Sequence, residues 1–302
     1  MKNVPIKGII PPILTPMNAD ETVNEQELRN QVNREIDAGV HGIFAFGTNG
    51  EAYALTSAEK NRVLEIVIGE TNHRVPVYAG TGCVTTKETI EMSKKAEAMG
   101  ADVLSVITPY FAAASQDELY AHYMEVAAAV DMPIVLYNIP ARTGNALVPA
   151  TVAKLAKNAP NIVGAKDSSG NFDNMKQYIQ LTRNLGKDFS VLSGNDSLIL
   201  PALVFGGQGG IAGCANVFPH TMVEIYEAFV AGDMERAMKV QDSIRTLRAV
   251  FKYGNPNTII KIATSLLGYP VGSCRKPFCQ LSAEGMEALK KALEACKTNG
   301  LH

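Results

Sequence analysis

A lysine at the end of an apolar segment is the side chain of this sequence with the clearest potential for chemistry. Lys166 directly follows Ile162–Ala165, and the small turn-forming residues Asp167–Gly170 come after it. An apolar run that stops at turn residues is typical of a buried parallel strand. A strand-end amine lies in or beside a medium of low dielectric constant, which favours the uncharged form that attacks ketones to give a Schiff base. The alternative is a lysine that extends from the strand end into water.

Other polar residues also follow apolar segments. Gly47–Glu51 contains Thr48 and Asn49, Tyr137 ends another apolar run, and Arg142 lies five residues further on. Each has a structural alternative, because a threonine satisfies tight turns and a tyrosine fills cores. An arginine in a loop with proline and glycine is also commonly a surface charge.

Strand-like and helix-like segments alternate eight times along the first three quarters of the chain. The predicted strands are 8–16, 42–46, 75–80, 103–108, 134–137, 162–166, 189–194 and 209–213. Eight such units predict an α/β protein, a (β/α)8 TIM barrel, in which strand ends and the loops after them form the active site. An open doubly wound sheet also alternates, but it normally has fewer units, and no phosphate-binding fingerprint follows the first strand. The glycine-rich segment 206–210 lacks a full phosphate-loop signature, which favours close backbone packing.

The strands stop near Pro219, and the rest of the chain has helical periodicity. The predicted helices are 222–230, 234–253, 258–267 and 286–295. We therefore expect a catalytic barrel over 1–230 and a C-terminal helical extension over 231–302.

Composition excludes several classes of protein. The 302 residues are 46% hydrophobic and 19% charged, enough for a full core, and the net charge of −2 gives no reason to expect binding to nucleic acid or to a membrane surface. No apolar run is long enough to cross a bilayer, and the N-terminus lacks the apolar core of a signal peptide. Five scattered cysteines fit a reducing cytoplasm and are expected to be small buried hydrophobes. The five histidines show no metal-ligand spacing, and His122 is expected on a helix surface.

Three of these segments together resemble the signatures of one family. Gly47–Glu51, Tyr137–Pro140 and Gly164–Ser168 are similar to motifs of the dihydrodipicolinate synthase/N-acetylneuraminate lyase family of pyruvate-dependent Schiff-base aldolases, in register over nearly the whole chain. The resemblance implies that Lys166 condenses with the ketone of pyruvate or another 2-oxo acid. It also implies that Tyr137 is the general acid/base. No metal and no organic cofactor is implied, because the imine itself is the electron sink.

The resemblance implies roles for the other positions too. Thr48 matches the hydroxyl that links to the tyrosine, and the backbone amides of Thr48 and Asn49 match those that hold the 2-oxo acid carboxylate. Main-chain groups of Gly194 and Ile211 are expected to line the site. Arg142 matches the arginine with which dihydrodipicolinate synthases bind the carboxylate of aspartate semialdehyde.

The substrate signals conflict. Asn49 stands where synthases usually have a second threonine, and Phe111 stands where family members usually have a tyrosine. Sugar-acid aldolases usually have a tyrosine at the second position too, so Phe111 is unusual for either function. The sequence slightly favours a lyase that cleaves a 2-oxo-3-deoxy sugar acid or a 4-hydroxy-2-oxo acid to pyruvate and an aldehyde. The alternative, which Arg142 supports, is 4-hydroxy-tetrahydrodipicolinate synthase, and a second alternative is a non-catalytic protein that binds a 2-oxo acid. The resemblance further implies a homotetramer, with the apolar loop at Phe111 as mild support, and the cysteine content favours a cytoplasmic protein.

Overall fold

The computed structural model describes residues 4–302, which form two compact units. The first unit contains the chain up to Gly8 and then Pro76–Ile211, and the second contains Ile9–Val75 and Ala212–His302. Strand β1 (Gly8–Ile9) is the point at which the chain first passes from one unit to the other.

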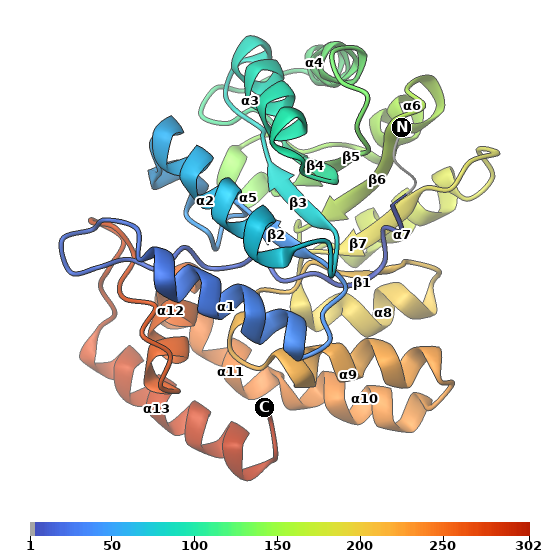
Figure 1. Ribbon diagram of the computed structural model, residues 1–302. Helices are drawn as coiled ribbons and strands as arrows, with labels where there is room; N and C mark the ends of the chain where they lie inside the picture. Colours follow the sequence, from blue (N-terminus) through green and yellow to red (C-terminus); the bar gives the residue numbers. More distant parts are fainter. Residues whose placement is uncertain (1–3) are drawn as a thin grey trace. The chain divides into compact units, whose positions relative to one another are not determined.

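The first unit is built on parallel strands that follow one another in chain order. They are β3 (Val77–Gly80), β4 (Val103–Ile107), β5 (Ile134–Asn138), β6 (Ile162–Asp167), β7 (Ser190–Ser193) and β8 (Gly209–Gly210). Each pairs with the next in parallel register, and Figure 1 shows β3 to β7 side by side with α3, α4 and α6 outside them. Most of their residues are buried, which explains why the strands read as continuous apolar runs rather than as alternating patterns.

Two glycines let backbones approach closely in this unit. A Cβ on Gly209 would lie 2.0 Å from the carbonyl oxygen of Gly8, and Gly209 has φ +149°. A Cβ on Gly164 would lie 2.7 Å from the carbonyl oxygen of Ser190. The close-packing interpretation of the glycine-rich segment is therefore confirmed at Gly209.

The helices of the first unit follow its strands along the chain. They are α3 (Thr86–Met99), α4 (Gln116–Ala128), α5 (Pro140–Thr143), α6 (Pro149–Asn158), α7 (Phe172–Thr182), the 3-10 turn η2 (Asp196–Leu198) and α8 (Ile199–Val204). The capping box of Ser115 and Glu118 at the start of α4 is present, as the sequence predicts.

His122 corrects an expectation about α4. Its ring is buried rather than on the helix surface, and its Nδ1 lies 2.9 Å from the hydroxyl of Thr86 on α3. Burial lowers the pKa of His122 to about 4, so the ring is neutral at pH 7. The helical pattern of α4 did not assign His122 to the apolar face of the helix. A histidine is nevertheless buried as readily as a tyrosine once its ring has a hydrogen-bond partner.

The second unit contains β2, the first two long helices and the end of the chain. Its early elements are β2 (Ile43–Ala45), α1 (Glu25–Asp37), the 3-10 turn η1 (Ala52–Ala54) and α2 (Ser57–Thr71). The predicted capping box of Thr56 and Glu59 starts α2. The first predicted strand, 8–16, is regular only over Gly8–Ile9, because the prolines after it cannot donate ladder hydrogen bonds. The segment nevertheless stays buried, with a parallel bridge from Pro12 to Phe44.

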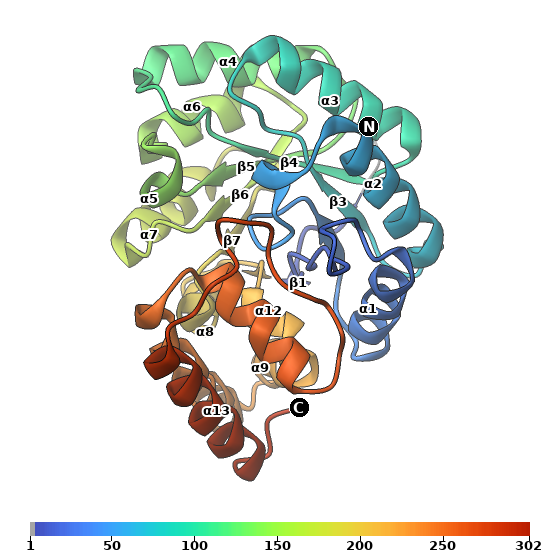
Figure 2. The same cartoon turned by 90° about the vertical axis from the view of Figure 1, so that its left-hand side faces the viewer.

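The chain ends in a series of helices. They are the 3-10 turn η3 (Gly213–Asn216), α9 (Pro219–Val230), α10 (Met234–Ser243), α11 (Arg245–Arg248), the 3-10 turn η4 (Ala249–Tyr253), α12 (Pro256–Leu266) and α13 (Ala283–Thr298). Figure 2 shows α12 and α13 near the end of the chain. The segment 234–253 is helical as predicted, but it is divided into α10, α11 and η4, with a break at Ile244 and a change to 3-10 geometry after Arg248. No glycine or proline stands between Met234 and Tyr253, so the sequence carried no signal for these breaks.

The order of elements is that of a (β/α)8 barrel with a C-terminal helical extension. Strands and helices alternate from β1 to β8, and four helices follow α9. Each strand from β3 to β8 pairs with the next in chain order, without the reversal of order that a doubly wound sheet has. The predicted fold class is therefore confirmed, and the doubly wound alternative is excluded.

Candidate active site

Lys166 and Tyr137 lie side by side at the carboxyl ends of two neighbouring strands. They are register partners on β6 and β5, and the Nζ atom of Lys166 lies 3.8 Å from the centroid of the Tyr137 ring. Lys166 is 3% exposed and Tyr137 is 4% exposed. The alternative of a lysine that extends into water is therefore excluded, and a buried amine meets an aromatic ring that carries a hydroxyl.

A polar layer directly after this pair fixes the two strand ends. Asn138 donates from Nδ2 to Asp167 Oδ1 at 2.8 Å and accepts the backbone N–H of Leu147 at 3.0 Å. Asp167 also accepts the Ser169 hydroxyl at 2.9 Å. Because both side chains are buried and satisfied, this layer holds the backbone that carries Lys166 and Tyr137. The sequence analysis did not single out Asn138 or Asp167, although polar residues that directly follow buried strands are a usable signal.

Gly194 brings a backbone against the Lys166 side chain. Its N–H donates to the carbonyl of Asp167 at 2.8 Å. A Cβ at this position would lie 2.8 Å from Lys166 Cε and 1.8 Å from Ser168 Oγ. The absence of a side chain at Gly194 therefore makes room for the lysine, and its role in lining the site stays a prediction.

Ser168 is a candidate site residue that sequence analysis missed. Its hydroxyl is buried and has no hydrogen-bond partner within the described residues 4–302. A buried hydroxyl without a partner is costly, and this one lies two residues from Lys166 and against Gly194. Its hydrogen-bonding capacity is therefore unused within the described residues.

Ile211 follows β8 and is buried. Its N–H donates to the carbonyl of Ser193 at 2.8 Å, so this amide is already engaged by the neighbouring strand. A contribution of Ile211 to ligand binding is thus left to its carbonyl and side chain, and its role stays a prediction.

Arg142 lies in the short helix α5 that follows β5. Its side chain is exposed, whereas the next residue, Thr143, is buried and accepts a hydrogen bond from Thr108 at 3.0 Å. Thr143 also donates to the carbonyl of Asn145 at 3.0 Å. The hydrogen bonds of Thr143 therefore hold the loop, while the Arg142 side chain is exposed. An exposed guanidinium on a fixed loop is suited to binding an anionic group.

The loop after β4 presents Phe111 to solvent. Phe111 is 99% exposed and has φ +78°, a backbone conformation that few non-glycine residues adopt. Asn145 holds this loop, donating to the carbonyls of Pro109 and Ala112 at 2.8 Å each and accepting the N–H of Ala114 at 2.8 Å. Phe111 is therefore an exposed aromatic side chain on a loop whose backbone is held by hydrogen bonds.

Thr48 and Asn49 belong to the second unit, in the loop after β2. Both are half-buried. The carbonyl of Thr48 accepts hydrogen bonds from the N–H of Glu51 at 3.1 Å and from Asn257 Nδ2 at 2.5 Å. These residues therefore have a defined backbone and partly open side chains.

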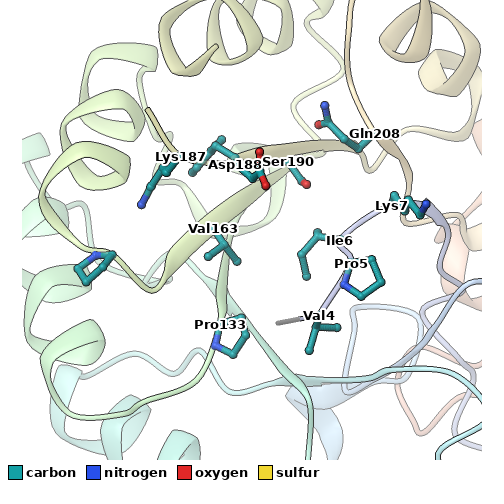
Figure 3. Close-up of a pocket in the computed structure, with 12 residues that line it drawn as sticks. Val4, Pro5, Ile6, Lys7, Pro133, Val163, Lys187, Asp188, Ser190 and Gln208 are labelled. Carbon is teal, nitrogen blue, oxygen red and sulfur yellow. The ribbon is translucent and has the colours of Figure 1, made fainter. Parts of the chain in front are cut away.

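A cavity of about 660 Å³ lies elsewhere in the first unit. Its lining includes the starts of strands rather than their ends: Val4–Lys7, Pro133, Pro160, Val163, Lys187–Ser190 and Gln208 (Figure 3). Lys187 donates to the carbonyls of Ala159 and Ile162 at 2.8 Å each, and burial lowers its pKa. None of the predicted site residues lines this cavity.

Three further features of the described residues concern metal ligands, membrane-spanning helices and cysteines. Across residues 4–302, no group of three or more His, Cys, Asp or Glu side chains is placed to hold a metal ion. No helix in the same range is long and apolar enough to cross a membrane. Four of the five cysteines are buried and Cys279 is partly so, and all five are free thiols.

Comparison with known proteins relates the chain to one family over nearly its whole length. Residues 5–296 match the model of the dihydrodipicolinate synthetase family. A 4-hydroxy-tetrahydrodipicolinate synthase of Methanopyrus kandleri is 43% identical over 291 residues, covering 96% of each chain. An uncharacterized DapA-like lyase of Halobacterium salinarum is 37% identical over 95% of this chain and 93% of its own.

Solved structures give the same relation. YagE, a prophage protein of the dihydrodipicolinic acid synthase family from E. coli K12 solved in complex with pyruvate, has a TM-score of 0.93 at 32% identity. The match covers 97% of this chain and 99% of that one. The dihydrodipicolinate synthase of Aquifex aeolicus has a TM-score of 0.91 at 34% identity, with 97% and 98% of the chains covered.

Proposed function

The chain belongs to the dihydrodipicolinate synthetase family of Schiff-base lyases, and we propose that it is a 4-hydroxy-tetrahydrodipicolinate synthase that condenses pyruvate with aspartate semialdehyde. The observation that carries the proposal is the contact of the buried Lys166 amine with the Tyr137 ring, with the exposed Arg142 in the short helix α5 that follows the strand of Tyr137. The sequence alone favoured cleavage of a sugar acid. The 43% identical relative named as a synthase supports the alternative instead.

Two residues of this chain are assigned to the steps of the proposed reaction, Lys166 to the covalent intermediate and Tyr137 to proton transfer. The Lys166 amine attacks the C2 ketone of pyruvate, and water leaves as the imine forms. Loss of a proton from C3 gives an enamine, whose C3 attacks the aldehyde carbon and forms the new carbon–carbon bond. The amino group from aspartate semialdehyde then adds to C2, and the ring closes as the bond from C2 to the Lys166 amine breaks. Tyr137 carries protons to and from the reacting oxygens, and its hydroxyl is on the ring that contacts Lys166.

The remaining assignments concern substrate binding. Thr48 and Asn49 are assigned to the pyruvate carboxylate through their backbone amides, with the Thr48 hydroxyl as the partner of the tyrosine. Gly194 and Ile211 are assigned to the lining, and Ser168 adds a buried hydroxyl without a partner in the described chain. Arg142 is assigned to the carboxylate of aspartate semialdehyde, because a guanidinium binds a carboxylate with two parallel hydrogen bonds.

Replacing Arg142 by alanine tests the choice of substrate. We expect KM for aspartate semialdehyde to rise about 10- to 100-fold, the value of a charge-assisted hydrogen bond, with KM for pyruvate within about twofold. Steady-state kinetics with each substrate varied in turn measures both. The matched control is Arg183→Ala, which removes another exposed arginine of the same unit.

A sugar-acid lyase is the second candidate, and Asn49, which stands where synthases usually have a second threonine, is the residue that favours it. On that alternative, Arg142→Ala leaves aspartate semialdehyde kinetics unchanged. The wild type would then release pyruvate from a 2-oxo-3-deoxy sugar acid faster than it consumes aspartate semialdehyde.

We further propose that the chain assembles as a homotetramer and that Phe111 lies in one of its contacts. Burying a phenylalanine side chain contributes about 1.5–3 kcal/mol, and a two-fold contact buries two of them. Phe111→Asp is therefore expected to shift the protein to a smaller species at micromolar concentration in sedimentation velocity. Phe205→Asp, at an exposed aromatic residue that packs on Phe172 within its own chain, is expected to leave the assembly unchanged. An unchanged sedimentation coefficient for Phe111→Asp would contradict the assignment.

A further inference from the structure

The loop that follows β2 adopts a backbone that it cannot hold by itself. Glu51 has φ +56° and Phe46 has φ +63°, both in the left-handed region. Such residues cost roughly 1 kcal/mol or more each and persist where surrounding contacts hold them. The contacts that hold this loop therefore determine where Thr48 and Asn49 lie.

A buried ion pair fixes one end of the loop. Lys261 of α12 contacts Glu51 Oε1 at 2.6 Å, and both side chains are fully buried. The other carboxylate oxygen of Glu51 accepts the N–H of Arg275 at 2.9 Å, and Lys261 also donates to the carbonyl of Ser273 at 2.9 Å. Because both carboxylate oxygens have partners, Glu51 is anchored from the C-terminal part of the chain.

Asn257, in the first turn of α12, fixes the peptide between Thr48 and Asn49. Its side chain is 1% exposed, and Nδ2 donates to the Thr48 carbonyl at 2.5 Å and to the Tyr53 hydroxyl at 3.2 Å. A peptide group is planar and trans, so its carbonyl and its N–H point in opposite directions. A Thr48 carbonyl held toward α12 therefore directs the Asn49 N–H away from α12.

The side chain of Asn49 packs against Gly213 in the same unit. A Cβ on Gly213 would lie 2.6 Å from Asn49 Nδ2 and 3.2 Å from Ile260 Cδ1 of α12. Asn49 thus rests where Gly213 has no side chain, with α12 beside it. Both its backbone and its side chain are placed by residues more than 150 positions later in the sequence.

We propose that Asn257 is a positioning residue for recognition of the 2-oxo acid carboxylate. It acts through the Thr48–Asn49 peptide, whose orientation decides whether the Asn49 N–H is available to the carboxylate. The inference rests on the proposed function, which assigns these amides to that carboxylate. It gives the C-terminal extension a part in substrate recognition.

The experiment compares two ketones that differ in the carboxylate. Pyruvate and acetone both form an imine with an amine, but acetone has a methyl group in place of the carboxylate. Borohydride reduces either imine to a stable adduct that intact-protein mass spectrometry counts. The variants are Asn257→Asp, which keeps the shape but turns the donor into an acceptor, and Asn257→Leu, which removes the donor. The second variant keeps the test available if a buried carboxylate prevents folding.

We expect both variants to raise the pyruvate concentration for half-maximal trapping about tenfold, with acetone trapping within about twofold of wild type. Tyr53→Phe, which removes the other partner of Asn257, is the control and should change neither. A purely structural role for Asn257 would lower trapping of both ketones together. That outcome, or unchanged pyruvate trapping, overturns the inference while the proposed function stands. A wild type that pyruvate does not label would instead overturn the proposed function, and this inference with it.

Discussion

Replacing Lys166 by alanine is expected to lower turnover on the order of 10⁴-fold or more, because no other group on this strand end supplies the covalent intermediate. Lys166 lies on the buried end of β6 against Tyr137, so the substitution removes the amine and leaves the polar layer of Asn138 and Asp167 in place. The measurement is kcat with pyruvate and aspartate semialdehyde, beside circular dichroism to show that the variant is folded.

Lys187→Met is the matched control for this prediction. Lys187 is a partly buried lysine of the same unit, and burial lowers its pKa. A lowered pKa alone would make it a second candidate nucleophile. Its amine instead donates to two backbone carbonyls at the other ends of the strands. Turnover of Lys187→Met within a few-fold of wild type is expected. Substantial turnover by folded Lys166→Ala would contradict the Schiff-base mechanism.

Tyr137→Phe has the second largest expected effect. The substitution keeps the ring that contacts Lys166 and removes only the hydroxyl, so the packing of the amine is preserved. Loss of a general acid/base group typically lowers the rate by about 10²–10⁴-fold, and we expect kcat to fall within that range. Pre-steady-state trapping with pyruvate and borohydride should show slow imine formation that still reaches completion.

The control for the tyrosine is Tyr123→Phe. Tyr123 is a buried tyrosine of α4 whose hydroxyl donates to the carbonyl of Val106 at 3.0 Å. Its loss should cost about 1 kcal/mol of unfolding free energy and leave kcat unchanged. A kcat of Tyr137→Phe within about fivefold of wild type would move the proton-transfer role to another group, with the Ser168 hydroxyl the first to examine.

Local patterns in the sequence predicted the parts of the site that depend on one strand or one helix start. Apolar runs ending in a reactive residue placed Lys166 and Tyr137 correctly on buried strand ends, and capping boxes located the starts of α2 and α4. The reason is physical, since burial and capping are properties of a few consecutive residues.

Contacts between distant segments could not be predicted in this way. Asn257 and Lys261 lie about 200 residues from the loop that they hold, and nothing in their local sequence marks them as its partners. The breaks between α10, α11 and η4 likewise have no glycine or proline to announce them. Buried His122 shows the same limit, because helical periodicity alone does not say which polar residue a neighbouring helix will cover.

The central claim is that Lys166 forms an imine with pyruvate, and intact-protein mass after incubation with pyruvate and borohydride tests it most directly. We expect a single reduced pyruvate adduct on the wild type, mapped to Lys166 by peptide analysis, and none on Lys166→Ala. Lys187→Met should carry the adduct as the wild type does. Binding of pyruvate without any adduct would contradict the account and favour a protein that binds 2-oxo acids without catalysis.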